Sequence, residues 1–194
     1  MDDSLHLHEG ERLLVSLRPS VALYIRGLVF GLLDALMIGF ILFIMSFGIG
    51  AALGGMELGQ GITLFVICYL VSYALVAFIR FKRWKTASFR VTTDRILMQY
   101  SETLFSTPLK TIKWGQYQES VLAKRRLFDL LFGARSLGIR NGNADSQYYS
   151  YFPSLKWGTD LKHYLDKADS TIRKGQANTL NPFVFKTRGK RDQE

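Results

Sequence analysis

The polar and apolar positions divide the chain into an apolar first part and an alternating second part. Residues 27–47 contain one charged side chain, Asp34, and residues 61–79 contain none. Each stretch is long enough for a helix to cross roughly 30 Å of hydrocarbon. The pattern therefore predicts two transmembrane helices joined by a Gly-rich turn at 48–61, and we expect this helical hairpin to occupy residues 22–83.

After the second apolar stretch the hydropathy changes to a period of two residues. Ala87, Phe89 and Val91 alternate with polar side chains, which is typical of a half-buried β-strand. Further segments of this kind are 95–100, 109–114, 116–123, 136–140 and 146–152. Short strands at regular spacing predict an antiparallel β domain, which we place at residues 84–173.

Two segments of this second part have helical patterns instead. Residues 124–133 form a short helical segment with Gly133 as its C-cap. The segment from Trp157 to Ile172 carries apolar residues on one helical face, and Ser154 is expected to be its N-cap. We expect this last helix to close the open end of a small barrel.

Basic residues flank the apolar stretches and are missing from the turn between them. The net charge of +9 equals that of residues 80–140, where thirteen Lys and Arg stand against four Asp and Glu, while the segment 48–61 has neither Lys nor Arg. Because basic loops stay on the cytoplasmic side, both termini are expected in the cytoplasm, beneath the inner (plasma) membrane. The residues predicted to contact anionic lipid are Arg80, Lys82, Arg83, Lys85, Lys124, Arg125 and Arg126.

Small and polar residues inside the apolar stretches predict how the two helices pack. Gly27 and Gly31 share a helical face with Asp34, and small side chains allow helices to approach closely. Ser72 should lie at a similar depth on the second helix, so we expect Asp34 to contact Ser72 or its neighbours Tyr73 or Tyr69. Two interpretations of Asp34 stay open: a polar contact between helices, or part of a proton or ion pathway.

The β segments also resemble a known family. The resemblance rests on a Thr-Thr-Asp-Arg-Ile turn (92–96), Ile112 and Trp114, the LFDLLFG segment (127–133), and Leu137 with Ile139. This order is similar to the bacterial PH-like domains of small membrane proteins, in which two membrane spans precede the domain, and it covers about residues 10–170. The resemblance implies an α+β membrane protein with a two-helix transmembrane hairpin followed by a PH-like small β-barrel capped by a C-terminal helix. It implies no catalytic residues.

The sequence carries no motif for enzymatic chemistry. It has neither a P-loop nor a nucleophile elbow, and its one cysteine, Cys68, lies inside an apolar stretch. Its histidines, His6, His8 and His163, lack the spacing of a metal site. We therefore expect a protein that is not an enzyme and has no cofactor or metal. The pI of about 9.7 raises nucleic acid as a partner, but cations beside membrane spans are more typical of the positive-inside rule.

The remaining segments complete the expected organisation. Residues 1–21 are interpreted as a cytoplasmic N-terminal arm, and residues 174–194 as a basic, disordered tail. We expect a membrane-anchored scaffold or self-assembly module that contacts anionic lipid, either as a homo-oligomer or with a membrane protein partner. The alternative is an accessory subunit of a membrane transport or envelope-processing complex.

Overall fold

The chain is organised as two compact units. The computed structural model describes residues 8, 10–52, 55, 58–100, 108–124, 127–142 and 149–184. One unit is Leu23–Lys85, and the other combines Met1–Ala22 with Thr86–Glu194. We call the first the hairpin and the second the β domain, and each is described by itself.

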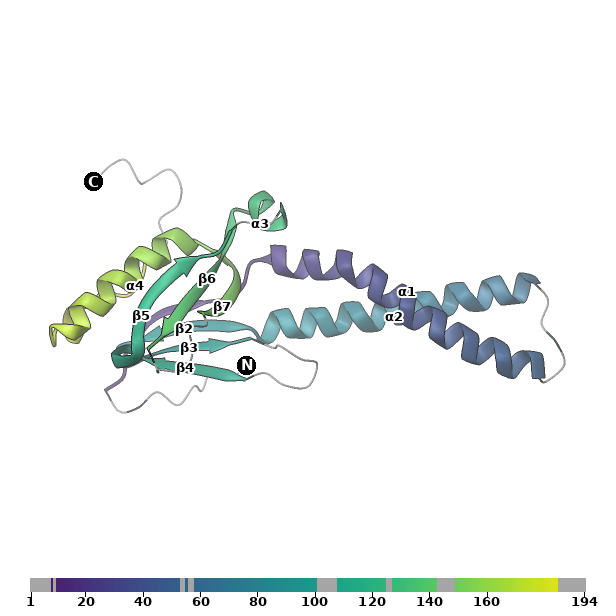
Figure 1. Ribbon diagram of the computed structural model, residues 1–194, viewed down its shortest axis with the longest axis horizontal. Coiled ribbons are helices and arrows are strands. Elements are labelled where there is room, and N and C mark those ends of the chain that lie inside the picture. Colours follow the sequence, from purple (N-terminus) through teal and green to yellow (C-terminus); the bar gives the residue numbers. More distant parts are fainter. Residues whose placement is uncertain are drawn as a thin grey trace. The chain divides into compact units, whose positions relative to one another are not determined.

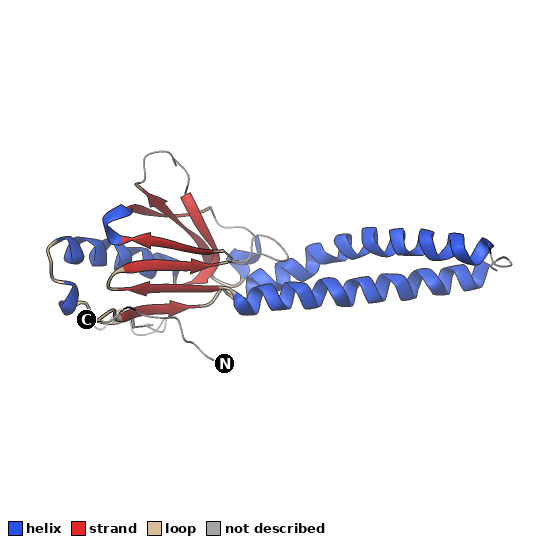
Figure 2. Ribbon diagram, turned by 90° about the horizontal axis from the view of Figure 1, so that it is seen from below, coloured by secondary structure: helices blue, strands red, loops and turns tan. Residues whose placement is uncertain are grey.

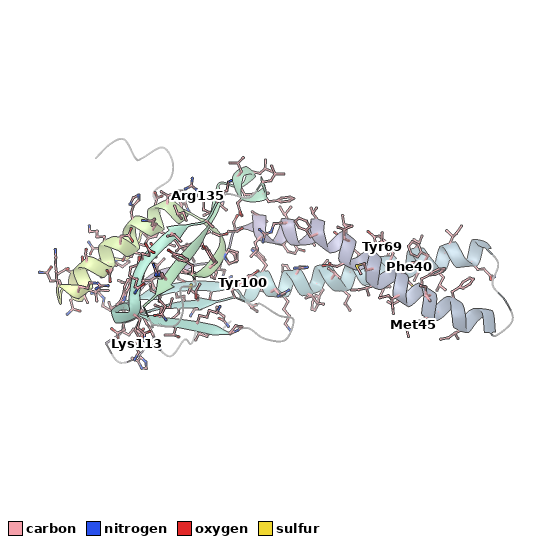
Figure 3. All side chains as sticks on the ribbon, viewed as in Figure 1. Phe40, Met45, Tyr69, Tyr100, Lys113 and Arg135 are labelled. Atoms are coloured by element: carbon pink, nitrogen blue, oxygen red, sulfur yellow. The ribbon has the colours of Figure 1, made fainter. Side chains whose placement is uncertain are left out.

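The hairpin consists of two long helices, α1 (Val21–Ala52) and α2 (Leu58–Thr86). With 32 and 29 residues, they extend about 48 and 43 Å, more than the roughly 30 Å of a hydrocarbon core. Their apolar side chains project outward along the helices, with Phe40 51% and Met45 63% exposed (Figure 3). Within the most apolar 18 residues of each helix, only 17% of α1 and 11% of α2 is buried. Both helices are long and apolar enough to cross a membrane, and both lack the burial of a soluble core helix.

The β domain contains two antiparallel sheets. The first has the order β1-β2-β3-β4 and the second the order β5-β6-β7. Strands β2 to β7 are labelled in Figure 1, and the strands are red in Figure 2. The strands of the first are β1 (Leu13–Leu17), β2 (Ser88–Thr92), β3 (Arg95–Gln99) and β4 (Leu109–Lys113). Those of the second are β5 (Tyr117–Leu122), β6 (Ala134–Asn141) and β7 (Tyr149–Lys156). The strands predicted from Ser88 to residue 140 are confirmed. Of the last predicted strand, 146–152, the first three residues lie outside the described residues, and the observed strand continues to Lys156.

The small barrel expected above is not found, because the described strands form two separate sheets. Between β4 and β5 the chain forms a 3₁₀ turn, η1 (Trp114–Gln116), and β5 starts the second sheet instead of extending the first. Trp114 and Tyr117, at either end of this turn, are both buried in the shared core. The two sheets are therefore joined by side-chain packing and not by a continuous hydrogen-bonded ladder.

Strand β1 was not expected from the sequence. Leu13–Leu17 pairs antiparallel with β2, so the whole hairpin is inserted between two neighbouring strands of one sheet. Residues 1–21, interpreted above as a separate arm, thus include a strand of the β domain. This strand could not be predicted from local sequence, because a five-residue strand is stable only when paired with another strand. Here the partner strand follows some seventy residues later in the chain.

One hydrophobic core lies between the sheets and helix α4 (Gly158–Arg173), which runs along β5 and β6 in Figure 1. The face predicted for α4 is confirmed, since Leu161, Leu165 and Ala168 are fully buried. Its N-cap is Trp157, in a left-handed conformation, and not Ser154. The α4 helix therefore covers the core shared by both sheets, as expected of the closing helix.

The segment after α4 folds back onto β1. Leu180 is buried, and the Phe183 amide donates a hydrogen bond to the Leu14 carbonyl at 2.9 Å. Tyr164 of α4 packs on Phe183 and donates to the Asn181 carbonyl. The expectation of a disordered tail from residue 174 is therefore wrong up to residue 184, and residues 185–194 lie outside the described residues. The order of this segment could not be predicted, because its hydropathy has no periodicity.

Candidate functional site

One face of α1 carries a small residue at every fourth position. Gly27, Gly31, Ala35 and Gly39 form this stripe, and the last three are buried. Gly27 and Gly31 were predicted to pack against the second helix, whereas the continuation through Ala35 and Gly39 was not predicted, although its spacing is visible in the sequence. The stripe is the interface with α2, because small residues let two helix backbones approach.

Two of these glycines leave no room for a side chain. A Cβ added at Gly31 would lie 2.9 Å from Cγ1 of Val76, and one added at Gly39 would lie 3.0 Å from Cα of Tyr69. The second contact is with backbone, which cannot rotate away. Close packing of α1 on α2 therefore depends on the absence of side chains at these positions.

Asp34 and Ser72 each have a partner other than the one expected. Arg80 Nη2 donates to Asp34 Oδ2 at 2.8 Å, which forms an ion pair between the helices. The Ser72 hydroxyl donates at 2.7 Å to the Cys68 carbonyl one turn earlier, and Tyr73 stacks on Tyr69. The polar contact between helices thus exists, but its second member is a cation that was predicted to contact lipid.

Aromatic rings surround the basic end of α2. Tyr24 lies 5.8 Å from the rings of both Phe81 and Trp84, and Lys85 Nζ lies 5.8 Å from the centre of the Phe81 ring. Aromatic and basic side chains together are typical of the membrane interface. The predicted lipid-contact residues Arg80, Lys82, Arg83 and Lys85 all lie in the last two turns of this helix.

Among the described residues of the β domain, the most apolar exposed segment is the short helix α3 (Leu127–Leu131). Leu127 and Leu131 are 71% exposed and Leu130 is 56% exposed, and Phe132 follows with its ring exposed. We call residues 127–132 the α3 tip. Among the basic residues predicted just before it, Lys124 is exposed, whereas Arg125 and Arg126 lie outside the described residues. The sequence predicted a short helical segment at 124–133, but nothing in its pattern showed that the leucines face outward.

A buried polar contact fixes the α3 tip. Asp129 is 1% exposed and accepts a hydrogen bond from the Ser154 hydroxyl of β7. The Ser154 carbonyl in turn accepts a bond of 2.6 Å from the amide of Ser20, the residue before α1. Because its one polar side chain points inward, the tip presents its leucines outward.

A cavity of about 570 Å³ opens beside the α3 tip. Its lining comes from the tip, the start of β6, the end of β7 and the first turn of α4: Leu130, Leu131, Phe132, Gly133, Arg135, Lys156, Trp157, Gly158, Thr159 and Asp160. Gly133 has φ +62° and ends α3, which confirms the predicted C-cap. Arg135, labelled in Figure 3, has a buried Nε with no hydrogen-bond partner among the described residues. The cavity therefore combines an apolar wall with two cations and one carboxylate.

A second buried carboxylate has a structural role. Glu11 accepts two hydrogen bonds of 3.0 Å from Arg95, one of 2.6 Å from Thr92 and one from the His8 amide. Burial alone would raise the pKa of Glu11, but these bonds outweigh it and hold the pKa at about 2. Thr92 and Arg95 belong to the turn on which the family resemblance rests, and this clamp ties that turn to the segment before β1.

Other titratable groups of the β domain are engaged within the fold. Asp166 of α4 accepts hydrogen bonds from Tyr117, Ser120 and Lys162. Burial raises the pKa of Tyr117, with a further rise from the Asp166 carboxylate. In the described part of the chain, no three His, Cys, Asp or Glu residues are placed to hold a metal ion.

Comparison with models of protein families, with curated proteins and with solved structures finds no match for this chain. Any function assigned to it therefore depends on its own residues. The features that carry such an argument are the apolar hairpin, the two-sheet domain and the α3 tip with its cavity.

Proposed function

We propose that the chain is a non-catalytic, membrane-anchored PH-like protein. Its hairpin spans the inner (plasma) membrane twice with both termini in the cytoplasm. Its β domain acts there as a scaffold or self-assembly module that contacts anionic lipid. The observation that carries the proposal is the exposed apolar surface along both helices of the hairpin.

Water is an unfavourable solvent for this surface, whereas lipid is a favourable one. Monomeric soluble proteins rarely expose contiguous apolar patches larger than a few hundred Å². Here exposed large apolar side chains continue from Val29 to Ile49 on α1 and from Ile62 to Phe81 on α2. The ion pair of Arg80 with Asp34 satisfies the charge that lies deepest in α1.

The PH-like assignment is supported by the order of elements. The seven described strands form a four-stranded and a three-stranded antiparallel sheet, and an amphipathic helix follows the last strand. The PH superfold implied by the resemblance has about seven strands and a closing C-terminal helix. The insertion of the hairpin after β1 departs from the expectation that both spans precede the domain.

Short connections support a location of the β domain at the membrane surface. Three residues separate β1 from α1, and Ala87 alone separates α2 from β2. An extended chain covers at most about 3.6 Å per residue. A hairpin that spans the bilayer therefore keeps both attachment points of the sheet within about 15 Å of the ends of its helices.

Self-assembly is best supported at β4. The C-terminal segment bonds to β1, at one end of the four-stranded sheet, whereas β4 ends the strand order at the other side. Four of its five residues are exposed, with Thr111 at the centre. An edge strand of this kind can pair with the same strand of a second copy.

Disulfide cross-linking in native membranes tests this proposal. In a Cys68→Ala background, Thr111→Cys should form a disulfide-linked dimer, since antiparallel pairing about the centre of β4 brings residue 111 beside its copy. The matched control is Ser170→Cys, which is exposed on α4 and should stay monomeric. Equal dimer formation by both variants argues against pairing at β4. Linkage of Thr111→Cys to one different protein favours the alternative, an accessory subunit of a membrane complex.

A further inference from the structure

We infer that the α3 tip and its cavity form a binding site for an anionic lipid headgroup. The leucines of the tip enter the bilayer surface, while Arg135 and Lys156 hold the lipid phosphate. The inference rests on the proposed function, because it requires a β domain tethered at a membrane. It adds a defined site and occupant to the general lipid contact proposed above.

The first argument is the composition and direction of the tip. Of its six residues only Asp129 is polar, and that side chain is buried against Ser154. Leu127 and Leu131 are turned to solvent with 71% of their surface exposed. An apolar segment held outward by an inward polar anchor suits the boundary between headgroups and acyl chains.

The second argument is the position of the tip within the β domain. Ser154 bonds both Asp129 of the tip and the amide of Ser20. Ser20 directly precedes α1, and its hydroxyl accepts a bond from the Ala22 amide in the first turn of that helix. Two hydrogen bonds therefore connect the tip to the point where the chain enters its first apolar helix. This is the part of the β domain that a spanning helix brings to the bilayer.

The third argument is the charge of the cavity. Arg135 and Lys156 line it against a single carboxylate, Asp160, and the buried Nε of Arg135 has no partner among the described residues. Lys124, just before the tip, adds a further exposed cation. The volume of about 570 Å³ lies within the range of small-molecule sites. The cavity thus has the size and net charge for a phosphate-bearing headgroup.

The apolar wall of the cavity favours a lipid over a soluble phosphate as its occupant. Leu130, Leu131 and Phe132 form one side of the cavity. An inorganic phosphate ion gains nothing from these side chains, whereas a lipid uses the cations for its headgroup and the leucines for its acyl chains. A lipid is therefore the occupant that uses both features.

A fluorescent probe on the tip tests the site in the full chain. Leu131→Cys, in a Cys68→Ala background, is labelled with an environment-sensitive dye and reconstituted into nanodiscs. The bilayers contain phosphatidylcholine alone or with increasing phosphatidylglycerol, and a lipid with a quencher on its acyl chain is added. We expect a blue shift and acyl-chain quenching that grow with phosphatidylglycerol. The control, labelled Ser170→Cys, should show neither.

Charge variants test the role of the cations. A basic residue near an anionic surface contributes about 1 kcal/mol, or about a fivefold change in affinity. Arg135→Gln and Lys156→Gln should each weaken the binding of phosphatidylglycerol by about this factor, and so raise the phosphatidylglycerol content needed for half the shift. Asp160→Asn should lower it, because the opposing carboxylate is removed. Unchanged midpoints in all three variants would overturn the assignment of the cavity.

The remaining outcomes separate the lipid site from the membrane anchor. A chain that enters nanodiscs but leaves the residue-131 probe in water refutes the lipid site alone. A chain that stays out of nanodiscs refutes the proposed function. A shift that follows protein concentration assigns the tip to a second copy, and loss of the shift on adding inorganic phosphate assigns the cavity to soluble phosphate. Either result overturns the lipid assignment.

Discussion

The clamp between Glu11 and Arg95 gives the sharpest stability prediction. The Glu11 side chain is fully buried and the Arg95 side chain is 19% exposed. Two hydrogen bonds of 3.0 Å join them. Glu11→Gln keeps the shape of the side chain but removes its charge. Because Glu11 precedes β1, the substitution weakens the attachment of that strand to the turn after β2.

The size of the expected loss in stability follows from the pKa of Glu11. A pKa of about 2 instead of 4.5 means that the folded state favours the carboxylate by roughly 3 kcal/mol at neutral pH. Breaking a buried ion pair commonly destabilises a protein by about 3–5 kcal/mol. We therefore expect Glu11→Gln to lower the free energy of unfolding by roughly 3 kcal/mol.

The pH dependence has a definite sign. A lowered pKa stabilises the fold above the unfolded value of 4.5, and this contribution declines as the pH falls toward 2. The wild type should therefore lose stability over this range, while Glu11→Gln has no carboxylate to protonate. The difference between the two proteins should be constant near neutral pH and shrink below about 4.5.

Urea unfolding of the full chain in detergent measures this difference. Trp114 is a suitable reporter, since it is buried and its indole nitrogen donates to the Thr92 carbonyl at 3.0 Å. Trp84 and Trp157 are replaced by Phe in all samples. Arg140→Gln, which removes an exposed ion pair with Glu119, is the control and should unfold like the wild type. Equal midpoints for Glu11→Gln and wild type at neutral pH would refute the reasoning.

Three further predictions concern the packing of each unit. Gly31→Leu should separate α1 from α2 and lower the thermal stability of the hairpin in detergent, whereas Gly48→Ala, with open space around its added Cβ, should not. Asp129→Ala should cost about 1–3 kcal/mol by leaving the buried hydroxyl of Ser154 unpaired, and should speed amide hydrogen exchange across the α3 tip; unchanged exchange there would contradict it. Phe183→Ala should speed exchange in β1, and exchange equal to wild type would show that the C-terminal segment does not hold that strand.

Local hydropathy patterns were sufficient to predict the strands and helices that bury one face. The alternation at β2 and the helical spacing of Leu161, Leu165 and Ala168 predicted both segments correctly, because burial of one face leaves its period in the sequence. Gly133 was identified because a helix end needs a residue with positive φ. These features depend on neighbours in the sequence.

Features that depend on distant partners could not be predicted. Glu11 is charged and lies next to exposed residues in the sequence, and only the folded sheet brings it to Arg95. Asp34 was matched to Ser72 by helix depth, but the long side chain of Arg80 reaches back over the glycine stripe, with its Cδ 3.4 Å from where a Cβ of Gly27 would be. The outward direction of the α3 leucines likewise follows from a hydrogen bond to β7.

The central claim is that the hairpin lies in a membrane, with the β domain on the cytoplasmic side. Single cysteines in a Cys68→Ala background test it, at Gly59 in the first turn of α2 and at Lys174 after α4, both exposed. A membrane-impermeant maleimide applied to intact cells should label Gly59→Cys, and should label Lys174→Cys only after permeabilisation. Labelling of Lys174→Cys in intact cells, or recovery of the protein in the soluble fraction, would contradict the account.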